Sequence, residues 1–579
     1  MTLNSIIIEK KMEKIFKIKE NISFQHWRTR FIVLAIILSF CIVIARSFYL
    51  QVITGEKLSK KGELGYSRTV LHSKFRGNIF DRNMFPLATS VPVDSIGIDP
   101  TNTNINSFQI EKIERYLDVN LNNLRKNLLT KKRKFLYIKR HISSEQLKVI
   151  MNMNISGLSI IKEQKRYYPL GEISAQIIGI NDLDGKGIEG SELMYDYLLR
   201  GDKEIHHFIR DNAGKTISSF RSKPKNNGED VQLTIDKRVQ TIAFDALKNS
   251  VIKNKAKEGS IVVIDATSGE LLAVANYPSF NPNNRSTYEY DSIRNKAFTD
   301  LFEPGSTMKP FFAAYALDRG VATSHEIYKI GEKIKISGSF INENEKIKTF
   351  NYLTLKQVIQ KSSQIGAVRI RNSLYDEQGV WNFLTKLGFG KESGLKFPGE
   401  RIGKLQNYEK WTQSDIASQS FGYGLSTNLL QLTSSYSIFS SSGKLIQVKL
   451  IKKDRNKNVG RLIKKNTAIE MNQILASVVS YAGSAPGAKV PGYIVAGKTG
   501  TVRIAEKGGY NSQKHRGTFI GFAPLENPRL LVGVSINSPE GANYYAGKIA
   551  APVFSDVVSE VFRYMKVPTQ IRVDSIEAF

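Results

Sequence analysis

The sequence contains one cysteine and seven histidines among its 579 residues. A single cysteine excludes a disulfide framework and any zinc or iron–sulfur site that needs several thiolates. A pair of histidines in an H-E-x-x-H motif is a common signature of a catalytic metal site, and the sequence contains no such motif or comparable pair. The sequence therefore predicts neither a metal site nor a cofactor.

Acidic residues are scarce relative to basic ones, since 53 Asp and Glu stand against 83 Lys and Arg and the formal net charge is +30. A nucleic-acid-binding protein concentrates its positive charge on one domain or helix and interleaves it with aromatic side chains. Here lysine is spread along the whole chain, so we expect no nucleic-acid partner. The hydrophobic content of 41% excludes a disordered chain. The length is sufficient for about three or four domains.

Only one long apolar run without charges is present, at residues 31–45. Extended to residue 52, this run approaches the roughly 20 residues that cross a bilayer. Trp27 before the run and Phe48–Tyr49 after it are typical of the two membrane interfaces. A cleaved signal peptide is the competing interpretation, but no A-x-A-like cleavage site follows the run. We therefore predict a single, uncleaved transmembrane helix at residues 31–52.

Basic residues flank both ends of this run, and those before it are Lys17, Lys19, Arg28 and Arg30. The positive-inside rule favours a cytoplasmic tail at residues 1–30, with nearly all of the chain on the other side of the membrane. No second run of comparable length follows, because the apolar stretches at 261–264 and 530–534 have the length of strands.

A polar linker at residues 222–228 (SKPKNNG) divides the exported part of the chain. Beyond the linker, alternation and capping signals predict strands, then a run of helices, then returning strands. The predicted strands are 231–235, 260–265, 270–275, 493–496, 518–522 and 530–536, and the predicted helices are 236–247, 309–319 and 355–374. This order is typical of an α+β domain of roughly 340 residues.

Residues 303–310 (EPGSTMKP) combine a candidate nucleophile with a candidate base. Pro304-Gly305 predicts a sharp turn, and the apolar residues that follow predict the first turns of a helix. Ser306 and Lys309 then share one face, because residues three apart on a helix are neighbours. A serine hydroxyl needs a base, and lysine can act as one where burial and a helix N-terminus lower its pKa. Other S-x-x-K matches, such as Ser250–Lys253, show that the spacing alone is not specific.

Two further segments are rich in polar residues. Residues 361–366 (KSSQIG) lie inside the predicted helix at 355–374 and, taken alone, are typical of a solvated helix end. Residues 496–501 (AGKTGT) leave a predicted strand, and the stretch 492–499 matches the phosphate-loop pattern G-x-x-x-x-G-K-[ST]. A phosphate loop must open a helix at its lysine, whereas here strand-like residues precede Lys498 and β-branched residues follow it. We therefore reject a nucleotide site.

In this order, Ser306, Ser362 and Lys498 resemble the S-x-x-K, S-x-N and K-T-G motifs of the penicillin-binding proteins and serine β-lactamases. Other segments extend the resemblance to the class B penicillin-binding proteins over most of the chain. These segments are 76–82 (RGNIFDR), 166–169 (RYYP), 187–190 (GIEG), 302–306 (FEPGS), 421–425 (FGYGL) and 539–554. The last two look most like the division-specific member of that class.

The resemblance implies an α+β fold with one N-terminal transmembrane helix. It further implies an elongated pedestal domain of the dimerisation type at 65–222 and a transpeptidase domain at 229–568, with a C-terminal tail at 569–579. The transpeptidase domain is expected to hold an antiparallel sheet with helices on both sides. The family also implies a single-pass protein of the cell inner membrane, with its catalytic domain on the periplasmic side.

The activity that the resemblance implies is that of a peptidoglycan D,D-transpeptidase at the division septum, acylated by β-lactams. Its substrates would be stem peptides and lipid-linked precursors, and its partners a septal membrane glycosyltransferase and other division proteins. The matching positions assign Ser306 as nucleophile, Lys309 as general base, and Ser362, helped by Lys498, as proton relay. The expected substrate-binding residues are Thr499, Gly500 and Thr501, and the backbone N–H groups of Ser306 and Thr501 would form the oxyanion hole.

Gln364 departs from the family, in which an asparagine completes the S-x-N motif. Glutamine keeps both the amide donor and the acceptor, but its extra methylene moves them by about a bond length. We expect the enzyme to remain active with Gln364 as a catalytic residue. Three alternatives stay open: a lateral-wall transpeptidase with the same catalytic residues, a β-lactamase or D,D-carboxypeptidase, and a division scaffold whose catalysis has decayed.

Overall fold

The computed structural model describes residues 3–570, except 74, 132, 134, 202, 211–215, 222–227, 454–459, 507–508 and 542–543. Most of the predicted linker at 222–228 and of the predicted tail at 569–579 lies outside the described residues. The chain forms two compact units, one of residues 1–73 with 202–225 and one of residues 74–201 with 226–579. The expected pedestal range, 65–222, contributes to both units.

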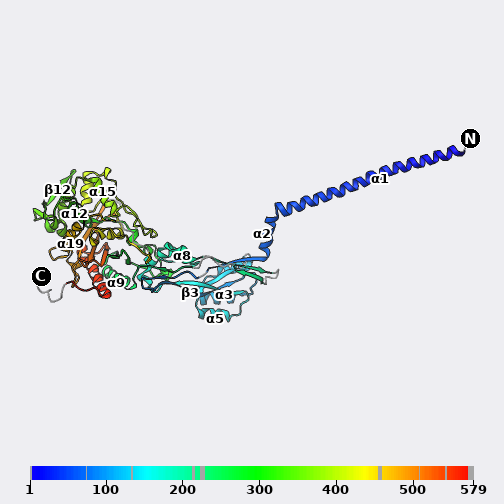
Figure 1. Cartoon of the computed structure of the whole chain (residues 1–579). Coiled ribbons are helices and arrows are strands. Elements are labelled where there is room, and N and C mark those ends of the chain that lie inside the picture. Colours follow the sequence, from blue (N-terminus) through cyan, green and yellow to red (C-terminus); the bar gives the residue numbers. More distant parts are fainter. Residues whose placement is uncertain are drawn as a thin grey trace. The chain divides into compact units, whose positions relative to one another are not determined.

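The first unit begins with one helix, α1 (Leu3–Phe48), which continues into a π-helical turn, η1 (Tyr49–Ile53) (Figure 1). The helix is long because the first glycine is Gly55 and no proline precedes it. Its segment His26–Ile53 is long and apolar enough to cross a membrane, and none of that segment is buried in the structure. The segment contains the predicted span at 31–52. Helix α2 (Gly55–Tyr66) and an antiparallel sheet follow, with the strands β1 (Ser67–Ser73), β6 (Lys203–Arg210) and β7 (Thr216–Arg221).

The second unit contains a pedestal part, residues 74–201, built on one long strand. Strand β3 (Pro86–Ile98) pairs with three others, β2 (Ile79–Phe80), β4 (Leu136–Ile142) and β5 (Leu158–Tyr167). One end of this sheet carries a separate small core formed with the helices α3 (Ser107–Leu117), α4 (Asn122–Thr130) and α5 (Ser144–Met151) (Figure 1). Strand β2 also pairs in parallel with β8 (Val231–Gln232), which joins the pedestal part to the C-terminal part, residues 226–570.

A buried cluster of charges lies inside the pedestal part. Arg76 donates from Nε to Glu192 Oε2 at 2.7 Å and from Nη1 to Asp196 Oδ1 at 2.6 Å. Arg166 donates from Nε to the other Glu192 oxygen at 2.6 Å. The carboxylate of Glu192 is fully buried between the two guanidinium groups. This cluster joins two segments that the sequence analysis singled out, 76–82 and 166–169, to residues that follow a third, 187–190.

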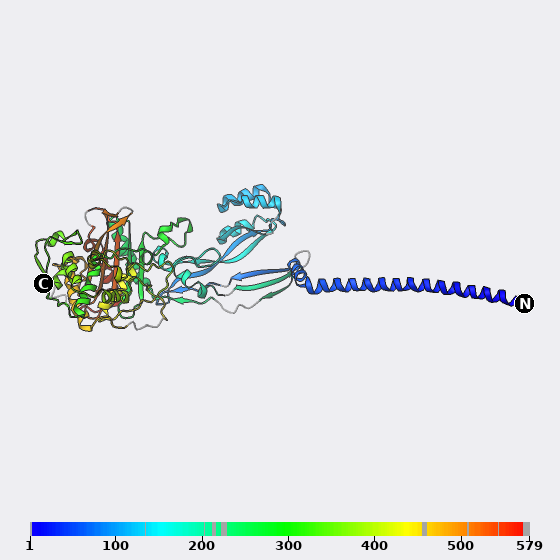
Figure 2. The same ribbon diagram turned by 90° about the horizontal axis from the view of Figure 1, so that it is seen from above.

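The C-terminal part is organised around a five-stranded antiparallel sheet in the order β10-β9-β17-β16-β15. Helices α9 (Lys237–Lys253) and α21 (Ala551–Met565) cover one face, and α17 (Leu429–Ser435) and α19 (Lys465–Val479) pack on the other. Figure 2 shows strands of this sheet surrounded by helices in the C-terminal part. The strands are β9 (Glu258–Asp265), β10 (Leu271–Tyr277), β15 (Ala496–Glu506), β16 (Gly509–Ala523) and β17 (Leu530–Asn537). The expected antiparallel sheet with helices on both sides is confirmed.

Several predicted elements are confirmed closely. Strands β9 and β10 form the hairpin expected at 260–275, and α9 starts after Asp236, whose carboxylate accepts the N–H of Arg238 at 2.9 Å. The helix expected at 309–319 is α12 (Lys309–Asp318). The strand expected at 231–235 is wrong in length, because only Val231–Gln232 pair with another strand and Leu233 continues as an isolated bridge.

Two boundaries predicted near the site are wrong. The strand expected at 493–496 begins only at Ala496, because the Tyr493 ring packs on Phe562 and its hydroxyl donates to the carbonyl of Val567. The helix expected at 355–374 is two helices, α13 (Leu355–Lys361) and α14 (Gln364–Asn372). The break between them is central to the candidate site.

Candidate active site

Ser306 lies in a short 3₁₀ turn, η4 (Gly305–Met308), that leads directly into α12. Gly305 has φ +59°, and its N–H donates to the carbonyl of Gly422 at 3.1 Å. A Cβ atom on Gly422 would lie 2.0 Å from the Gly305 oxygen, so only glycine permits this contact. The segments 302–306 and 421–425 therefore pack against each other and leave Ser306 half-buried. Its hydroxyl makes no hydrogen bond to a described residue.

Lys309 is the first residue of α12 and is only 1% exposed. Its Nζ donates to the carbonyl oxygen of Ser362 at 2.8 Å and lies 3.4 Å from the Ser362 hydroxyl. Burial lowers the pKa of Lys309 to about 7, and the negative charge of Glu343 opposes this shift. A lysine with this pKa can exist in its neutral, proton-accepting form near neutral pH.

Lys498 lies in β15 and is fully buried. Its Nζ donates to the Ser362 hydroxyl at 2.9 Å and to the carbonyl of Thr499 at 3.1 Å. Burial, and then the charge of Lys309, hold the pKa of Lys498 well below its usual range. The Ser362 hydroxyl therefore lies between two lysine side chains and can pass a proton between them.

The interruption between α13 and α14 places Ser362 at this position. Ser362 has φ +60° in the left-handed region and ends α13, and Ser363 begins α14 as its N-cap. The Ser363 hydroxyl accepts the N–H of Gly366 at 2.9 Å. The interpretation of 361–366 as a solvated helix end is wrong, because Ser363 is fully buried. Gln364 is half-buried, and its side-chain amide has no hydrogen-bond partner in the described part of the chain.

The residues of the K-T-G motif lie inside β15. The sequence predicted instead that they follow the end of a strand. Residues 497–501 pair with β16, from Gly497 opposite Gly521 to Thr501 opposite Gly517. This extended backbone excludes the helix start that a phosphate loop needs. A Cβ atom on Gly500 would lie 2.7 Å from the carbonyl oxygen of Pro304. Gly500 therefore allows β15 to pack directly on the turn that carries Ser306.

The two threonines of this motif contact Ser484, which sequence reasoning missed, and Ala546, which lies in the segment 539–554. The hydroxyls of Thr499 and Ser484 lie 3.0 Å apart, and the Thr501 hydroxyl accepts the N–H of Ala546 at 3.0 Å. Glu343 is also new, and its carboxylate contacts the start of α14. Neither Ser484 nor Glu343 lies in a recognisable motif. Among the described residues, no group of three or more His, Cys, Asp or Glu is placed to hold a metal ion.

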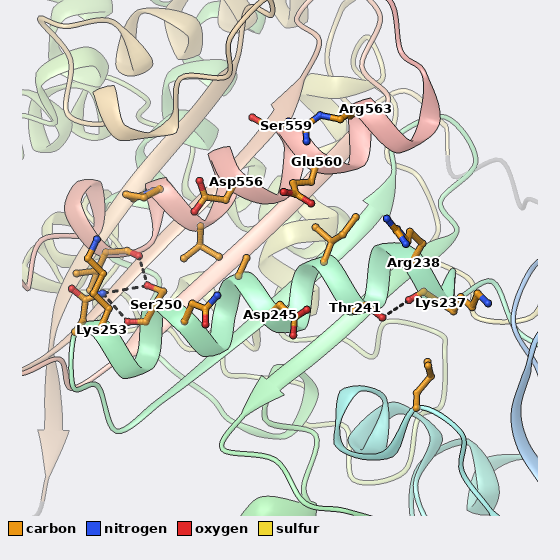
Figure 3. A pocket seen from close by; sticks show the side chains of 18 of the residues that line it. Lys237, Arg238, Thr241, Asp245, Ser250, Lys253, Asp556, Ser559, Glu560 and Arg563 are labelled. Atoms are coloured by element: carbon orange, nitrogen blue, oxygen red, sulfur yellow. Dashed lines mark hydrogen bonds between the residues drawn. The ribbon is translucent and has the colours of Figure 1, made fainter.

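A separate groove of about 970 Å³ lies between α9 and α21 (Figure 3). Ser306, Lys309, Ser362 and Lys498 do not line it. Its charged residues include Lys237, Arg238, Asp245, Lys253, Asp556, Glu560 and Arg563. Ser250 and Lys253 there repeat the S-x-x-K spacing, but Lys253 is exposed. Burial of the lysine, and not the spacing, distinguishes the site at Ser306.

Comparison with known proteins identifies the two domains of the chain. Residues 73–233 match the penicillin-binding protein dimerisation domain, and residues 259–559 match the penicillin-binding protein transpeptidase domain. The chain is 35% identical over 536 residues to the probable peptidoglycan D,D-transpeptidase PenA of Neisseria meningitidis, covering 92% of this chain and 91% of that protein. It is 32% identical over 564 residues to the peptidoglycan D,D-transpeptidase FtsI of Escherichia coli, covering 96% and 95%.

A solved structure shares the fold over most of the chain. A peptidoglycan synthetase from Bifidobacterium adolescentis superposes with a TM-score of 0.68 at 24% identity, covering 87% of this chain and 98% of that one. The order of domains, the sheet and the identity to curated relatives point to one family. The chain belongs to the class B penicillin-binding proteins, with a dimerisation domain followed by a transpeptidase domain.

Proposed function

We propose that this chain is a peptidoglycan D,D-transpeptidase that cross-links stem peptides at the division septum through a serine acyl-enzyme. The observation that carries the proposal is the burial of Lys309 three residues after Ser306, with its Nζ bonded to the Ser362 carbonyl. A general base works best when its pKa is near the operating pH, and that of Lys309 is lowered to about 7. The names of the PenA and FtsI relatives support the same chemistry.

In the first half-reaction, Ser306 is the nucleophile and Lys309 the general base. Ser306 Oγ bonds to the carbonyl carbon between the two terminal D-alanines while its proton passes to Lys309 Nζ. The N–H groups of Ser306 and Thr501 stabilise the oxyanion, with an expected contribution of about 3 kcal/mol for each donor. The C–N bond then breaks, and the leaving amine takes its proton through the Ser362 hydroxyl, which lies 2.9 Å from Lys498 Nζ.

In the second half-reaction, an amine from a neighbouring stem peptide attacks the ester carbon. Its proton passes through Ser362 and Lys309 to Ser306 Oγ as the bond from the ester carbon to that oxygen breaks, and the cross-link forms. Lys498, together with Thr499, Gly500 and Thr501, holds the carboxylate of the donor peptide. Among the described strands, β15 pairs only with β16, so its other edge is open to an extended peptide. The Gln364 side-chain amide, which has no hydrogen-bond partner among the described residues, would bind that peptide.

Labelling with a fluorescent penicillin tests the proposal on the full chain in detergent. The wild type should form a covalent adduct that persists for hours, and Ser306→Ala should form none. Ser250→Ala is the matched control, because Ser250 repeats the S-x-x-K spacing outside the site and should leave labelling unchanged. Labelling of Ser306→Ala at the wild-type level contradicts the assignment. Rapid loss of the adduct would instead favour a β-lactamase or D,D-carboxypeptidase.

The septal role is the finer part of the proposal, supported by the FtsI relatives and the 421–425 and 539–554 segments. In this proposal the helix at 26–53 anchors the chain once in the inner membrane, with residues 1–30 cytoplasmic and the catalytic domain periplasmic. The pedestal (65–222) and this helix contact a septal glycosyltransferase and other division proteins, and the transpeptidase domain (229–568) binds the substrates.

A fluorescent fusion of the full chain tests the septal role and should collect at mid-cell. A signal along the cylinder favours the lateral-wall alternative. Cells that tolerate Ser306→Ala but not deletion of the pedestal favour the scaffold alternative.

A further inference from the structure

The carboxylate of Glu343 accepts hydrogen bonds from the residues that follow Ser362 in its turn. Glu343 follows strand β13 (Ser339–Asn342), and only 4% of the residue is exposed. Its Oε1 accepts the N–H groups of Gln364 and Asn344, each at 2.8 Å. Its Oε2 accepts the Ser363 hydroxyl and the N–H of Ile365. Four donors therefore converge on one carboxylate.

These contacts complete the start of α14. The first turn of a helix has N–H groups without partners inside the helix. Glu343 accepts two of them, from Gln364 and Ile365, and the Ser363 hydroxyl accepts the next, from Gly366. The positive end of the helix dipole also favours a negative charge at this position. No cation in the described ranges forms a salt bridge with Glu343, so the carboxylate acts on the α14 backbone.

The turn that Glu343 supports is strained. A residue other than glycine in the left-handed region costs about 1–2 kcal/mol, and Ser362 has φ +60°. The carbonyl of this same residue accepts the Lys309 Nζ, and its hydroxyl accepts the Lys498 Nζ. The position of Ser362 therefore depends on the hydrogen bonds that fix the next two residues to Glu343.

Glu343 also acts on Lys309 through its charge. The groups that face Lys309 are Glu343, which favours the ammonium form, and Lys498, which faces it across the Ser362 hydroxyl. Charged side chains on the other helices packed on α12 have contacts of their own. Lys361 lies over the Phe350 ring, Arg371 pairs with Glu377, and Asp376 accepts the hydroxyl of Tyr315.

We propose that Glu343 is a positioning residue of this active site. It holds the turn of Ser362 and Gln364 in place and, through its charge, sets the pH at which Lys309 becomes a free base. This inference rests on the proposed acyl-enzyme function. It assigns a role to a residue outside the three catalytic motifs, contributed by the hairpin of β12 (Lys333–Ile336) and β13.

The test measures the acylation rate of the full chain by fluorescent penicillin between pH 5 and 9. Glu343→Gln should lower the maximal acylation rate at least tenfold. The amide nitrogen of glutamine cannot accept the hydrogen bonds that one Glu343 oxygen accepts from the turn of Ser362. It should also move the acid limb of the profile to lower pH, because loss of the negative charge lowers the pKa of Lys309 further. Glu343→Asp keeps the charge, so the acid limb should stay at the wild-type pH. Its maximal acylation rate should lie between those of Glu343→Gln and the wild type. Glu345→Gln is the matched control, since Glu345 is 81% exposed and pairs with Lys348, and it should change neither.

Two results overturn the proposal. One is a folded Glu343→Gln protein whose maximal acylation rate and acid limb equal those of the wild type. The other is a Glu343→Gln protein with a lower maximal rate but an acid limb at the wild-type pH, which a merely structural contact would produce. If Glu343→Gln does not fold, Glu343→Asp carries the test, and a wild-type maximal rate in that variant overturns the proposal. A wild-type chain that penicillin does not acylate at all refutes the proposed function itself, and this inference with it.

Discussion

The pedestal part and the active site both bury basic side chains, but they surround them differently. Arg76 and Arg166 are 5% and 6% exposed, and the carboxylate of Glu192 lies within 2.7 Å of both. Lys309 and Lys498 are 1% and 0% exposed, and no carboxylate in the described part of the chain forms a salt bridge with either. In the pedestal part a carboxylate neutralises the two buried arginines. In the active site no described residue forms a salt bridge with either buried lysine.

The choice of side chain matches this difference. A guanidinium group does not lose its proton in proteins, so a buried arginine needs a carboxylate partner. A buried lysine can instead become neutral, and its pKa falls. Burial without a carboxylate partner therefore makes Lys309 a base, whereas an arginine buried in the same way would keep an uncompensated charge.

The largest expected effect follows from removing the base. Lys309→Met should lower the rate of acylation by fluorescent penicillin by about 10²–10⁴-fold, the usual contribution of a general base. Thermal unfolding should stay unchanged or shift upward, because methionine fills a similar volume and carries no charge to desolvate.

The matched control is a buried lysine that has a partner. Lys296 is 7% exposed, and its Nζ lies 2.6 Å from Glu258 Oε2. Lys296→Met should lower the unfolding temperature and leave the acylation rate of the folded protein unchanged. If Lys309→Met destabilises the chain as much as Lys296→Met does and still reacts with penicillin, the contrast between the two kinds of site is wrong.

The second effect concerns the pedestal cluster. Glu192→Gln removes the charge shared by Arg76 and Arg166, and breaking a buried pair in this way costs about 3–5 kcal/mol. Denaturant unfolding of the full chain measures this cost, and acylation of the remaining folded protein should be normal. Asp184→Asn is the control, because this partner of Arg140 is 81% exposed and such pairs contribute at most about 1 kcal/mol. Equal stability losses in the two variants would contradict the importance of burial.

The third effect is a pH dependence that the pedestal charges do not cause. Neutral Lys309 is required, so the acylation rate should fall about tenfold for each pH unit below the pKa of about 7. The rate at pH 5 should therefore be roughly 100-fold lower than the rate near pH 8. Rates measured at constant ionic strength check this expectation, and a flat profile from pH 5 to 8 would exclude Lys309 as the base.

Part of the site could be predicted from the sequence because its signals are local. Ser306 and Lys309 are three residues apart at the start of an apolar helix, and Pro304-Gly305 marks that start. The order of the three motifs then supplied the family. The fold class followed from the order of strands and helices, and the hairpin of β9 and β10 from its turn residues.

The rest depends on contacts between distant segments. The apolar pattern of 355–374 continues through Ser362, and nothing local shows that the helix breaks there. The break is stabilised by Glu343, which lies 19 residues earlier in a polar stretch, residues 342–345 (NENE), without a recognisable motif. The predicted strand ends at Ala496, yet Gly497 and Gly500 both pair with β16 despite the low strand propensity of glycine. A Cβ atom on Gly497 would lie 2.5 Å from the Phe519 ring, and one on Gly500 would lie 2.7 Å from the Pro304 carbonyl oxygen, so close packing excludes larger residues at both positions.

The smallest expected effect concerns Gln364, which is neither a buried charge nor part of an ion pair. Gln364→Asn should leave the unfolding temperature unchanged, because its side-chain amide has no partner among the described residues, while its backbone N–H keeps the bond to Glu343. The acylation rate should rise by about three- to tenfold, since each factor of ten corresponds to only about 1.4 kcal/mol and one methylene repositions a single amide. Gln360→Asn, on the neighbouring helix α13, is the matched control and should not change the rate. A loss of activity in Gln364→Asn would show that the site is adapted to the longer side chain. Either direction of change identifies the amide as a substrate contact, and an unchanged rate would contradict a role of this amide in substrate binding.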